Sequence, residues 1–299
     1  MIRALSAALL APLLACLALA GCREAPPPPP PTAETTARPA LWAVDDDAGQ
    51  TAGWLFGTIH ALPDGTRWRT GAVTAALGRA GVLVVEVRNL DQQAITRTFT
   101  RIAANTPGPP LLDRLPPASR RDLRALLSEQ GVPATRFDGL ETWAAALALA
   151  RLGAAGEPEN GVDRALIARF APRPVRELEG AAAQLAIFDA LPEEDQRAML
   201  AAVVAEHGEG EAQQAAMARA WLAGDLARLQ RLARRGLLSD ADLYEALLAG
   251  RNRAWAQRIL PMLERGDRPF VAVGAAHMLG ADGLPALLAA QGYAVRRIQ

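Results

Sequence analysis

The chain has 299 residues, of which 51% are hydrophobic, and its 32 basic residues balance its 32 acidic residues. This length and composition can supply a large buried core and indicate a globular protein. With a formal net charge of zero there is no basic surplus for nucleic acid and no acidic surplus for a solvating tail, so we expect no nucleic-acid partner.

Residues 1–22 have the pattern of a targeting segment. A short basic start, MIR, precedes the apolar stretch ALSAALLAPLLACLALA, which ends in LAGC. This ending resembles the lipobox of bacterial lipoproteins, in which the cysteine, here Cys22, is lipidated and becomes the first residue. An ordinary secretory signal cut nearby, or an uncleaved anchor, is the alternative. We expect a periplasm-facing location in the cell envelope. Arg23 rather than Asp follows the cysteine, which favours the outer membrane over the inner one.

Residues 23–40 form a Pro-rich linker with six consecutive prolines. Such a run favours a stiff polyproline II rod without internal hydrogen bonds and indicates a spacer between a membrane anchor and a folded domain. Cys16 would leave with the targeting segment and Cys22 would carry lipid. The domain would then hold no thiol for a disulfide, a metal site or a nucleophile.

Residues 41–299 predict an α/β domain. The runs LWAVDD and TAGWLFGTI predict a β-hairpin, RWRTGAVTAALGRAG predicts a helix that ends on Gly81, and GVLVVEVRN predicts a strand buried on both faces. Strand character returns near the C-terminus, in RPFVAVGAA and YAVRRIQ, with a helix between these two strands. Strands at both ends of the domain predict a central mixed sheet flanked by helices.

The middle of the domain, about residues 115–266, predicts a large helical insertion. Its apolar residues recur at three- and four-residue spacing in segments rich in Ala, Leu, Arg, Glu and Gln. One strand, residues 173–179, interrupts these helices. The helices are expected at Ser119–Gln130, Leu140–Leu152, Val162–Phe170, Ala181–Ala190 and over much of 193–266.

One short frame occurs twice, in WLFGTIHALPDG (54–65) and in FVAVGAAHMLGADG (270–283). In each copy an apolar run ends at a Gly, and a His follows three residues later. Sites in open α/β sheets form at the carboxyl ends of strands, so adjacent strands would bring His60 and His277 into one site. The alternative is that each histidine caps a strand end and binds loop carbonyls.

Glu86 lies inside the apolar run VLVVEVRN, where an ionised carboxylate is costly unless it is paired, protonated or bound to a metal. Strand alternation places Glu86 and Arg88 on one face, so an ion pair between them is one interpretation. The other is a site with both histidines, because two imidazoles and a carboxylate are a familiar catalytic metal set.

Several separated segments together resemble the TraB/PrgY/GumN family over residues 41–299. In chain order they are GTIHALPDG, VLVVEV, GVDRALIARFAPRPVRELEGAAAQL, WLAGD, RNRAWAQRI and FVAVGAAHMLGADGLPALLAAQGYAVRRI. The resemblance implies a sheet with helices on both faces and a site of two Gly-x-x-His motifs and a glutamate, which fall on His60, His277 and Glu86. The family is related to the Tiki proteases, which use manganese or cobalt rather than zinc. It is related more distantly to erythromycin esterases and ChaN-like haem-binding proteins.

Two further residues match segments of that family. Glu179, in RELEG, is a candidate acid–base group, although an ion pair with a nearby arginine is an equal alternative. Arg251, in the Arg-Asn pair of AGRNRAWAQR, could bind a substrate carboxylate or hold a carboxylate of the site, because guanidinium favours bidentate pairing. A purely structural role for Arg251 is the third interpretation.

These observations predict a lipid-anchored, metal-dependent hydrolase that cleaves a peptide or another small substrate. His60, Glu86 and His277 would hold the ion, which would be manganese or cobalt by resemblance, with zinc as a further option. The chain has no Gly-x-Ser-x-Gly elbow, no phosphate-binding loop and no His-Glu-x-x-His motif. The alternatives are a non-catalytic envelope lipoprotein that binds a metal, haem or a peptide signal, and an envelope scaffold.

Overall fold

The computed structural model describes residues 37–299 except 61, 64, 104–107, 153–160 and 207–209. The chain divides into two units, Met1–Thr35 and Thr36–Gln299, and all described residues belong to the second. The predicted targeting segment with Cys22, and the linker up to residue 36, lie outside the described residues. No helix in the described ranges has both the length and the apolar character that a membrane crossing requires.

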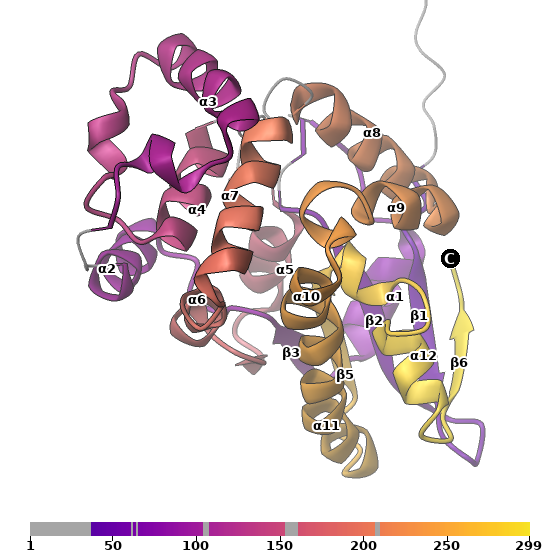
Figure 1. Cartoon of the computed structure of the whole chain (residues 1–299). Helices are drawn as coiled ribbons and strands as arrows, with labels where there is room; N and C mark the ends of the chain where they lie inside the picture. Colours follow the sequence, from indigo (N-terminus) through magenta and orange to yellow (C-terminus); the bar gives the residue numbers. More distant parts are fainter. Residues whose placement is uncertain (1–36, 61, 64, 104–107, 153–160, 207–209) are drawn as a thin grey trace, which may run out of the picture. The chain divides into compact units, whose positions relative to one another are not determined.

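The fold is α/β, as predicted, and is built on a six-stranded mixed sheet in the order β4-β3-β5-β2-β1-β6 (Figure 1). The strands are β1 (Leu41–Asp45), β2 (Thr51–Thr58), β3 (Val82–Val85), β4 (Val175–Glu177), β5 (Pro269–Gly274) and β6 (Ala294–Arg297). β4, β3, β5 and β2 run parallel to one another, whereas β1 is antiparallel to both β2 and β6. The predicted hairpin and the four other predicted strand regions are confirmed.

Helices make up most of the remaining described chain. The α-helices are α1 (Gly71–Arg79), α2 (Gln92–Ile102), α3 (Pro117–Glu129), α4 (Thr142–Leu152), α5 (Val162–Phe170), α6 (Ala181–Asp189), α7 (Glu193–Glu206), α8 (Gly210–Ala223), α9 (Leu226–Ala233), α10 (Ala241–Tyr244), α11 (Gly250–Glu264) and α12 (Leu284–Ala289). Short 3₁₀ turns lie at η1 (Leu111–Arg114), η2 (Ala134–Phe137), η5 (Gly236–Ser239) and η7 (Ala275–Met278), and a π-helical turn at η6 (Glu245–Ala249). α2 was not expected from the sequence.

One face of the sheet packs against α1, α5, α8 and α9 in a single apolar cluster. Aromatic rings fill its centre: Phe56 of β2 lies 5.8 Å from Phe270 of β5 and 6.1 Å from Trp221 of α8, centroid to centroid. Trp221 also donates its indole N–H to the carbonyl of Gly57 at 2.8 Å. These contacts hold α8 and α9 over the carboxyl end of β2.

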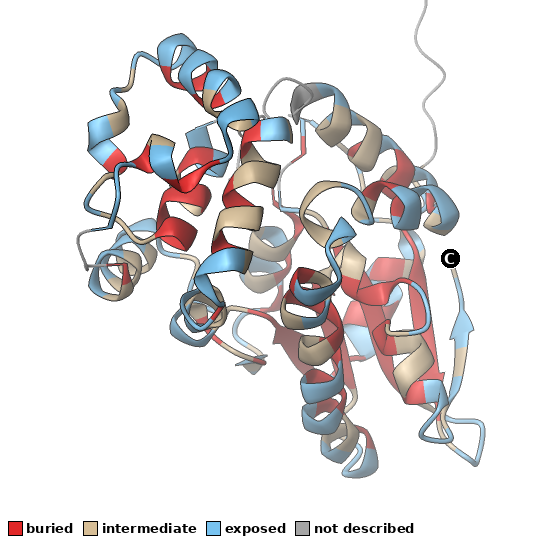
Figure 2. Cartoon of the chain, viewed as in Figure 1, coloured by how far each residue is buried: buried red, intermediate tan, exposed pale blue. Residues whose placement is uncertain are grey.

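The opposite face packs against α11 and α12 in a second cluster, which includes Trp255, Ile259 and Leu263 of α11. β1, β2, β3 and β5 are therefore buried on both sides, whereas the edge strands β4 and β6 are largely exposed (Figure 2). This explains why β3 and β5 read as unbroken apolar runs rather than as alternating ones.

The helices of the predicted insertion, about residues 115–266, divide into those that cover one or the other face of the sheet and those that pack away from it. α5, α8, α9 and α11 cover the sheet, and β4 joins the sheet as its edge strand. α3, α4 and α7 instead form a third cluster that contains no strand residue and is centred on the buried Trp143. The central sheet thus draws on the middle of the chain as well as on its ends.

Candidate active site

The carboxyl ends of the four parallel strands lie side by side, and each strand is followed by a residue predicted for the site. Glu86 comes directly after β3, and His60 lies two residues beyond β2. Glu179 lies two residues beyond β4, and His277 lies in η7 after β5. β2 and β5 are adjacent and parallel, with Thr58 paired to Gly274. The condition under which the two Gly-x-x-His frames could share one site, that their strands are adjacent, is met.

His60 is held by Asp163 in the first turn of α5. Its Nδ1 lies 2.9 Å from Oδ2 of Asp163, and the Thr58 hydroxyl donates to the other carboxylate oxygen at 2.7 Å. The hydrogen bond with Asp163 raises the pKa of His60 to about 9. Since 77% of the His60 side chain is exposed, its Nε2 edge opens toward solvent and the site.

His277 is held by Asn252 of α11. Nδ1 of the ring lies 2.6 Å from Oδ1 of Asn252, and Nδ2 of the same amide donates to the carbonyl of Asp282 at 2.7 Å. A carbonyl only accepts, so the amide nitrogen must face Asp282 and the amide oxygen must face the ring. Nδ1 of His277 therefore carries the proton, and Nε2 keeps a lone pair. Burial lowers the pKa of His277 to about 3, so this ring is neutral near pH 7.

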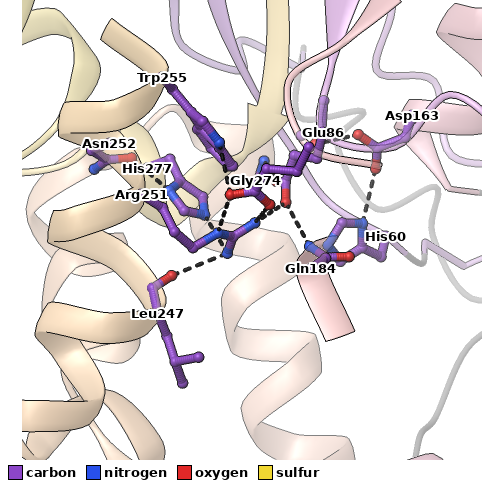
Figure 3. Close-up of polar contacts among 12 residues, drawn as sticks. His60, Glu86, Asp163, Gln184, Leu247, Arg251, Asn252, Trp255, Gly274 and His277 are labelled. Carbon is purple, nitrogen blue, oxygen red and sulfur yellow. Dashed lines mark hydrogen bonds and ion pairs between the residues drawn. The ribbon is translucent and has the colours of Figure 1, made fainter. Parts of the chain in front are cut away.

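Arg251 connects the carboxylates of the site (Figure 3). Its Nε and one Nη pair with the two oxygens of Glu179 at 3.0 and 2.9 Å, and the same Nη donates to Oε2 of Glu86 at 2.9 Å. The other Nη donates to the carbonyl of Leu247 at 3.0 Å and lies 3.4 Å from Nε2 of His277. These contacts use all five N–H groups of a guanidinium. Of the roles considered from the sequence, they correspond to holding the carboxylates of the site.

Two features fix Arg251 and Glu179 further. The π-helical turn η6 precedes α11 and ends two residues before Arg251, and such turns are frequent at functional sites. The indole N–H of Trp255 donates to Oε1 of Glu179 at 2.8 Å. The same indole ring lies 4.4 Å from the His277 ring, centroid to centroid. Trp255 thus supports both halves of the site.

Glu86 is buried and accepts hydrogen bonds on both oxygens. Oε1 accepts from the backbone N–H of Gly274 at 2.7 Å, and Oε2 accepts from Arg251 and from the side chain of Gln184 at 3.1 Å. Burial alone would raise the pKa of Glu86, but His277, Arg251 and the Gly274 N–H outweigh it and lower that pKa. The ion pair with Arg88 that strand alternation had suggested is not the one formed: Glu86 pairs with Arg251.

Two cavities meet at these residues. The larger, about 290 Å³, is lined by both histidines, Glu86 and Arg251, and its other walls are largely apolar. The smaller, about 240 Å³, extends to the far side of His60 and Glu86, toward α2 and α5. His60, Glu86 and Gln184 line both cavities and form the border between them.

The residues present fit a divalent transition metal in donor type, but the carboxylate is engaged elsewhere. Two imidazoles, each with Nδ1 held by an oxygen, suit such an ion. Within the described part of the chain, however, no group of three or more His, Cys, Asp or Glu side chains is close enough to hold one ion. Both oxygens of Glu86 are occupied by N–H donors, one of them from Arg251.

Sequence reasoning missed several supporting residues. Asp163 and Gln184 lie on helices α5 and α6, where a polar residue reads as solvent-facing. Asn252 was noted only as the neighbour of Arg251. The available sequence signal for Asp163 was its place two residues after Gly161, in the first turn of a predicted helix. In the structure this helix begins beside the end of β2, because the Val162 N–H donates to the Ile59 carbonyl.

Comparison with known proteins assigns the chain to a family. No curated protein and no solved structure matches it. The model of the TraB/PrgY/gumN family matches residues 40–297, which is most of the chain and contains every site residue described above. The resemblance seen in the sequence segments is thereby confirmed, and the chain belongs to the TraB/PrgY/gumN family.

Proposed function

We propose that this chain is a metal-dependent hydrolase that cleaves a peptide, with Nε2 of His60, Nε2 of His277 and a carboxylate oxygen of Glu86 as the ligands. Manganese or cobalt is the ion that the relation to Tiki proteases implies, and zinc is the third option. The observation that carries the proposal is shared by the two histidines. Each is held through Nδ1 by an oxygen, and each lines the same cavity.

Histidines that bind a metal usually give their second ring nitrogen to a carboxylate, a carbonyl or water, which fixes the tautomer and the direction of the free nitrogen. Asp163 and Asn252 fulfil this role here. Only an unprotonated nitrogen can bind an ion. His277, neutral near pH 7, already meets this condition, whereas His60, whose pKa is raised to about 9, must release a proton when the ion binds. When bound, the ion would lower the pKa of a water molecule and polarise the scissile carbonyl.

Arg251 and Glu179 are positioning residues in this proposal. Glu179 accepts from Arg251 twice and from Trp255 and lines neither cavity of the site, so it positions Arg251 rather than contacting a substrate there. For Glu86 and His277 to act as ligands, Arg251 must release both Oε2 of Glu86 and Nε2 of His277. The charge of Arg251 would stay compensated, because it keeps both contacts with Glu179.

The test combines metal content with turnover. The mature protein is loaded with manganese, cobalt or zinc and incubated with a peptide library, with and without a chelator. We expect cleavage that the chelator abolishes, and loss of both metal and cleavage in His60→Ala and His277→Ala. Arg258→Gln, at an exposed position of α11, is the matched control and should keep both. Full metal affinity in the double-histidine variant would overturn the assignment.

A second candidate is a non-catalytic binding protein for a metal, haem or a peptide signal. The observation that favours it is the closed network around Arg251, in which Glu86 is already neutralised. Haem absorption on reconstitution, or peptide binding without turnover under any of the three metals, would support this candidate over the hydrolase.

We further propose that Cys22 carries lipid and anchors the domain in the cell envelope, with the outer membrane favoured. The support is the LAGC ending of the apolar segment and the Pro-rich spacer that follows it. Membrane fractionation and lipid labelling test this. The wild-type protein should sediment with membranes and incorporate labelled lipid, and Cys22→Ala should incorporate none. Equal lipid labelling of both proteins would contradict it.

A further inference from the structure

Arg164 lies in the wall of the smaller cavity and has no carboxylate partner among the residues that the structure describes. It lies in the first turn of α5 and lines that cavity together with Leu90, Ile95 and Asp163. One Nη donates to the carbonyl of Leu90 at 3.0 Å. A guanidinium carries five N–H donors, and the Nε donor of Arg164 is buried without an acceptor among the described residues.

Among the described residues, the carboxylates that line the smaller cavity are Asp163 and Glu86, and both are engaged by other residues. Asp163 pairs with His60 and accepts from Thr58. Glu86 pairs with Arg251. A partly buried cation whose donors lack acceptors is costly, and an incoming anion would remove that cost. A carboxylate suits the site best, because its two oxygens match the fork of an arginine.

The larger cavity offers the opposite chemistry. Its walls away from the border include Met217, Trp221, Leu229 and Leu279. A ligand that spans both cavities would therefore place an apolar group against these side chains and an anionic group beside Arg164. Its central portion would lie at the border, against His60, Glu86 and Gln184.

We propose that Arg164 is a substrate-binding residue that recognises a carboxylate. The substrate class is a peptide with an apolar residue in the larger cavity and a carboxylate in the smaller one. That carboxylate is either the free C-terminus or an acidic side chain of the next residue. This assignment rests on the proposed hydrolase, because it places the scissile bond at the border, but its binding step can be tested without catalysis.

The experiment measures binding by isothermal titration calorimetry on the mature protein with a chelator present, so that metal-dependent cleavage does not compete. Three probes differ only in charge: acetyl-Leu-Gly with a free C-terminus, acetyl-Leu-Gly-amide, and acetyl-Leu-Asp-amide. Each is titrated into the wild type, Arg164→Gln and the control Arg169→Gln, which alters an exposed position of the same helix.

We expect at least one acidic probe to bind the wild type about tenfold or more tightly than the neutral amide. Arg164→Gln should remove this preference while it binds the neutral amide unchanged, and Arg169→Gln should keep the preference. A preference for acetyl-Leu-Gly alone identifies the C-terminus as the source, and one for acetyl-Leu-Asp-amide alone identifies the side chain. Equal binding of all three probes, or a preference that survives in Arg164→Gln, would overturn the proposal.

Two further outcomes keep the test decisive. If Arg164→Gln does not fold, Arg164→Lys replaces it; this variant keeps the charge but loses the fork, so a reduced preference is expected and an unchanged one counts against the site. Binding that depends on Arg164, without cleavage under any metal, would leave this site standing and remove the hydrolase. Cleavage that does not depend on Arg164 would support the hydrolase and overturn the Arg164 site.

Discussion

Nδ1 of His277 lies 2.6 Å from Oδ1 of Asn252, and the Asn252 side chain is completely buried. The amide cannot turn over, because its nitrogen is bound to the carbonyl of Asp282. One buried asparagine therefore decides which ring nitrogen of His277 is available to the cavity. The contact joins α11 to the turn after β5, so it also ties the helical layer to the end of the sheet.

Removing this contact should impair function more than folding. We expect Asn252→Leu to lower metal affinity or turnover about 10–100-fold, the usual effect of losing a partner behind a metal-binding histidine. Asn252→Asp keeps an acceptor for Nδ1 and should recover most of the loss. Measured kcat/KM and metal titrations check this, with urea unfolding as the folding control. If Asn252→Leu matched the wild type in both, Nε2 of His277 would not be a functional group.

Arg251 should be one of the most sensitive positions for stability. Its side chain and those of Glu86 and Glu179 are each only about one-tenth exposed. Arg251→Met would leave two buried carboxylates without their cationic partner, so we expect a loss of about 3–5 kcal/mol in the free energy of unfolding. Urea denaturation measures it, and Arg258→Met, on the exposed face of the same helix, should change stability little. A comparable loss in both variants would point to the helix rather than to the ion pairs.

Acid should destabilise the metal-free protein through His277. The pKa of His277 is about 3 in the folded protein, whereas an unfolded histidine titrates near 6.5. Between these values the unfolded chain binds the extra proton, so the free energy of unfolding falls as the pH falls from about 6.5 toward 3. Urea unfolding over a pH series in chelator should show this slope. The slope should be smaller in His277→Gln, and equal slopes would contradict the buried, neutral ring.

The two frame glycines should respond differently to substitution. A Cβ on Gly57 would lie 2.9 Å from the backbone Cα of Ala275, so Gly57→Ala must shift a strand or η7 and should cost about 1–3 kcal/mol. A Cβ on Gly274 would lie 3.2 Å from Oε1 of Glu86 and 3.6 Å from the His277 ring. Gly274→Ala should therefore disturb the site more than the fold. Thermal unfolding and kcat/KM together separate the two effects, and the opposite ranking would contradict this placement.

The sequence predicted the strands of this fold and the residues at their ends, because that information is local. An apolar run that stops at Gly57 or at Gly274 shows where a strand ends whatever lies beside it. The pairing of the two frames followed from the rule that sites gather at strand ends. α2 escaped prediction because QQAITRTFTRI carries several β-branched residues and buries none of its side chains completely. The available sequence signal was Asp91, a favoured helix N-cap residue, whose carboxylate accepts a hydrogen bond from the Ala94 N–H in the structure.

The contacts of the site could not be predicted in the same way, because they join distant segments. Nothing near Glu86 indicates that its partner is Arg251 rather than Arg88, since both arginines satisfy the need of a buried carboxylate. The choice depends on how α11 packs against β3 and β5, which is a property of the whole domain. The same holds for Arg164, because its unpartnered Nε and its place in a cavity wall depend on how α5 packs in the folded domain.

The position of β5 has a consequence for the time at which the domain can form. β5 lies between β2 and β3 in the sheet, yet it follows the entire helical middle in the chain. A ribosome therefore delivers the two flanking strands long before the strand that joins them. Until then β2 and β3 have no contact across the sheet, and His60 and Glu86 have no His277. A chain that ends before β5 would lose the centre of its sheet as well as the edge strand β6, so only a domain synthesised through β5 can be competent.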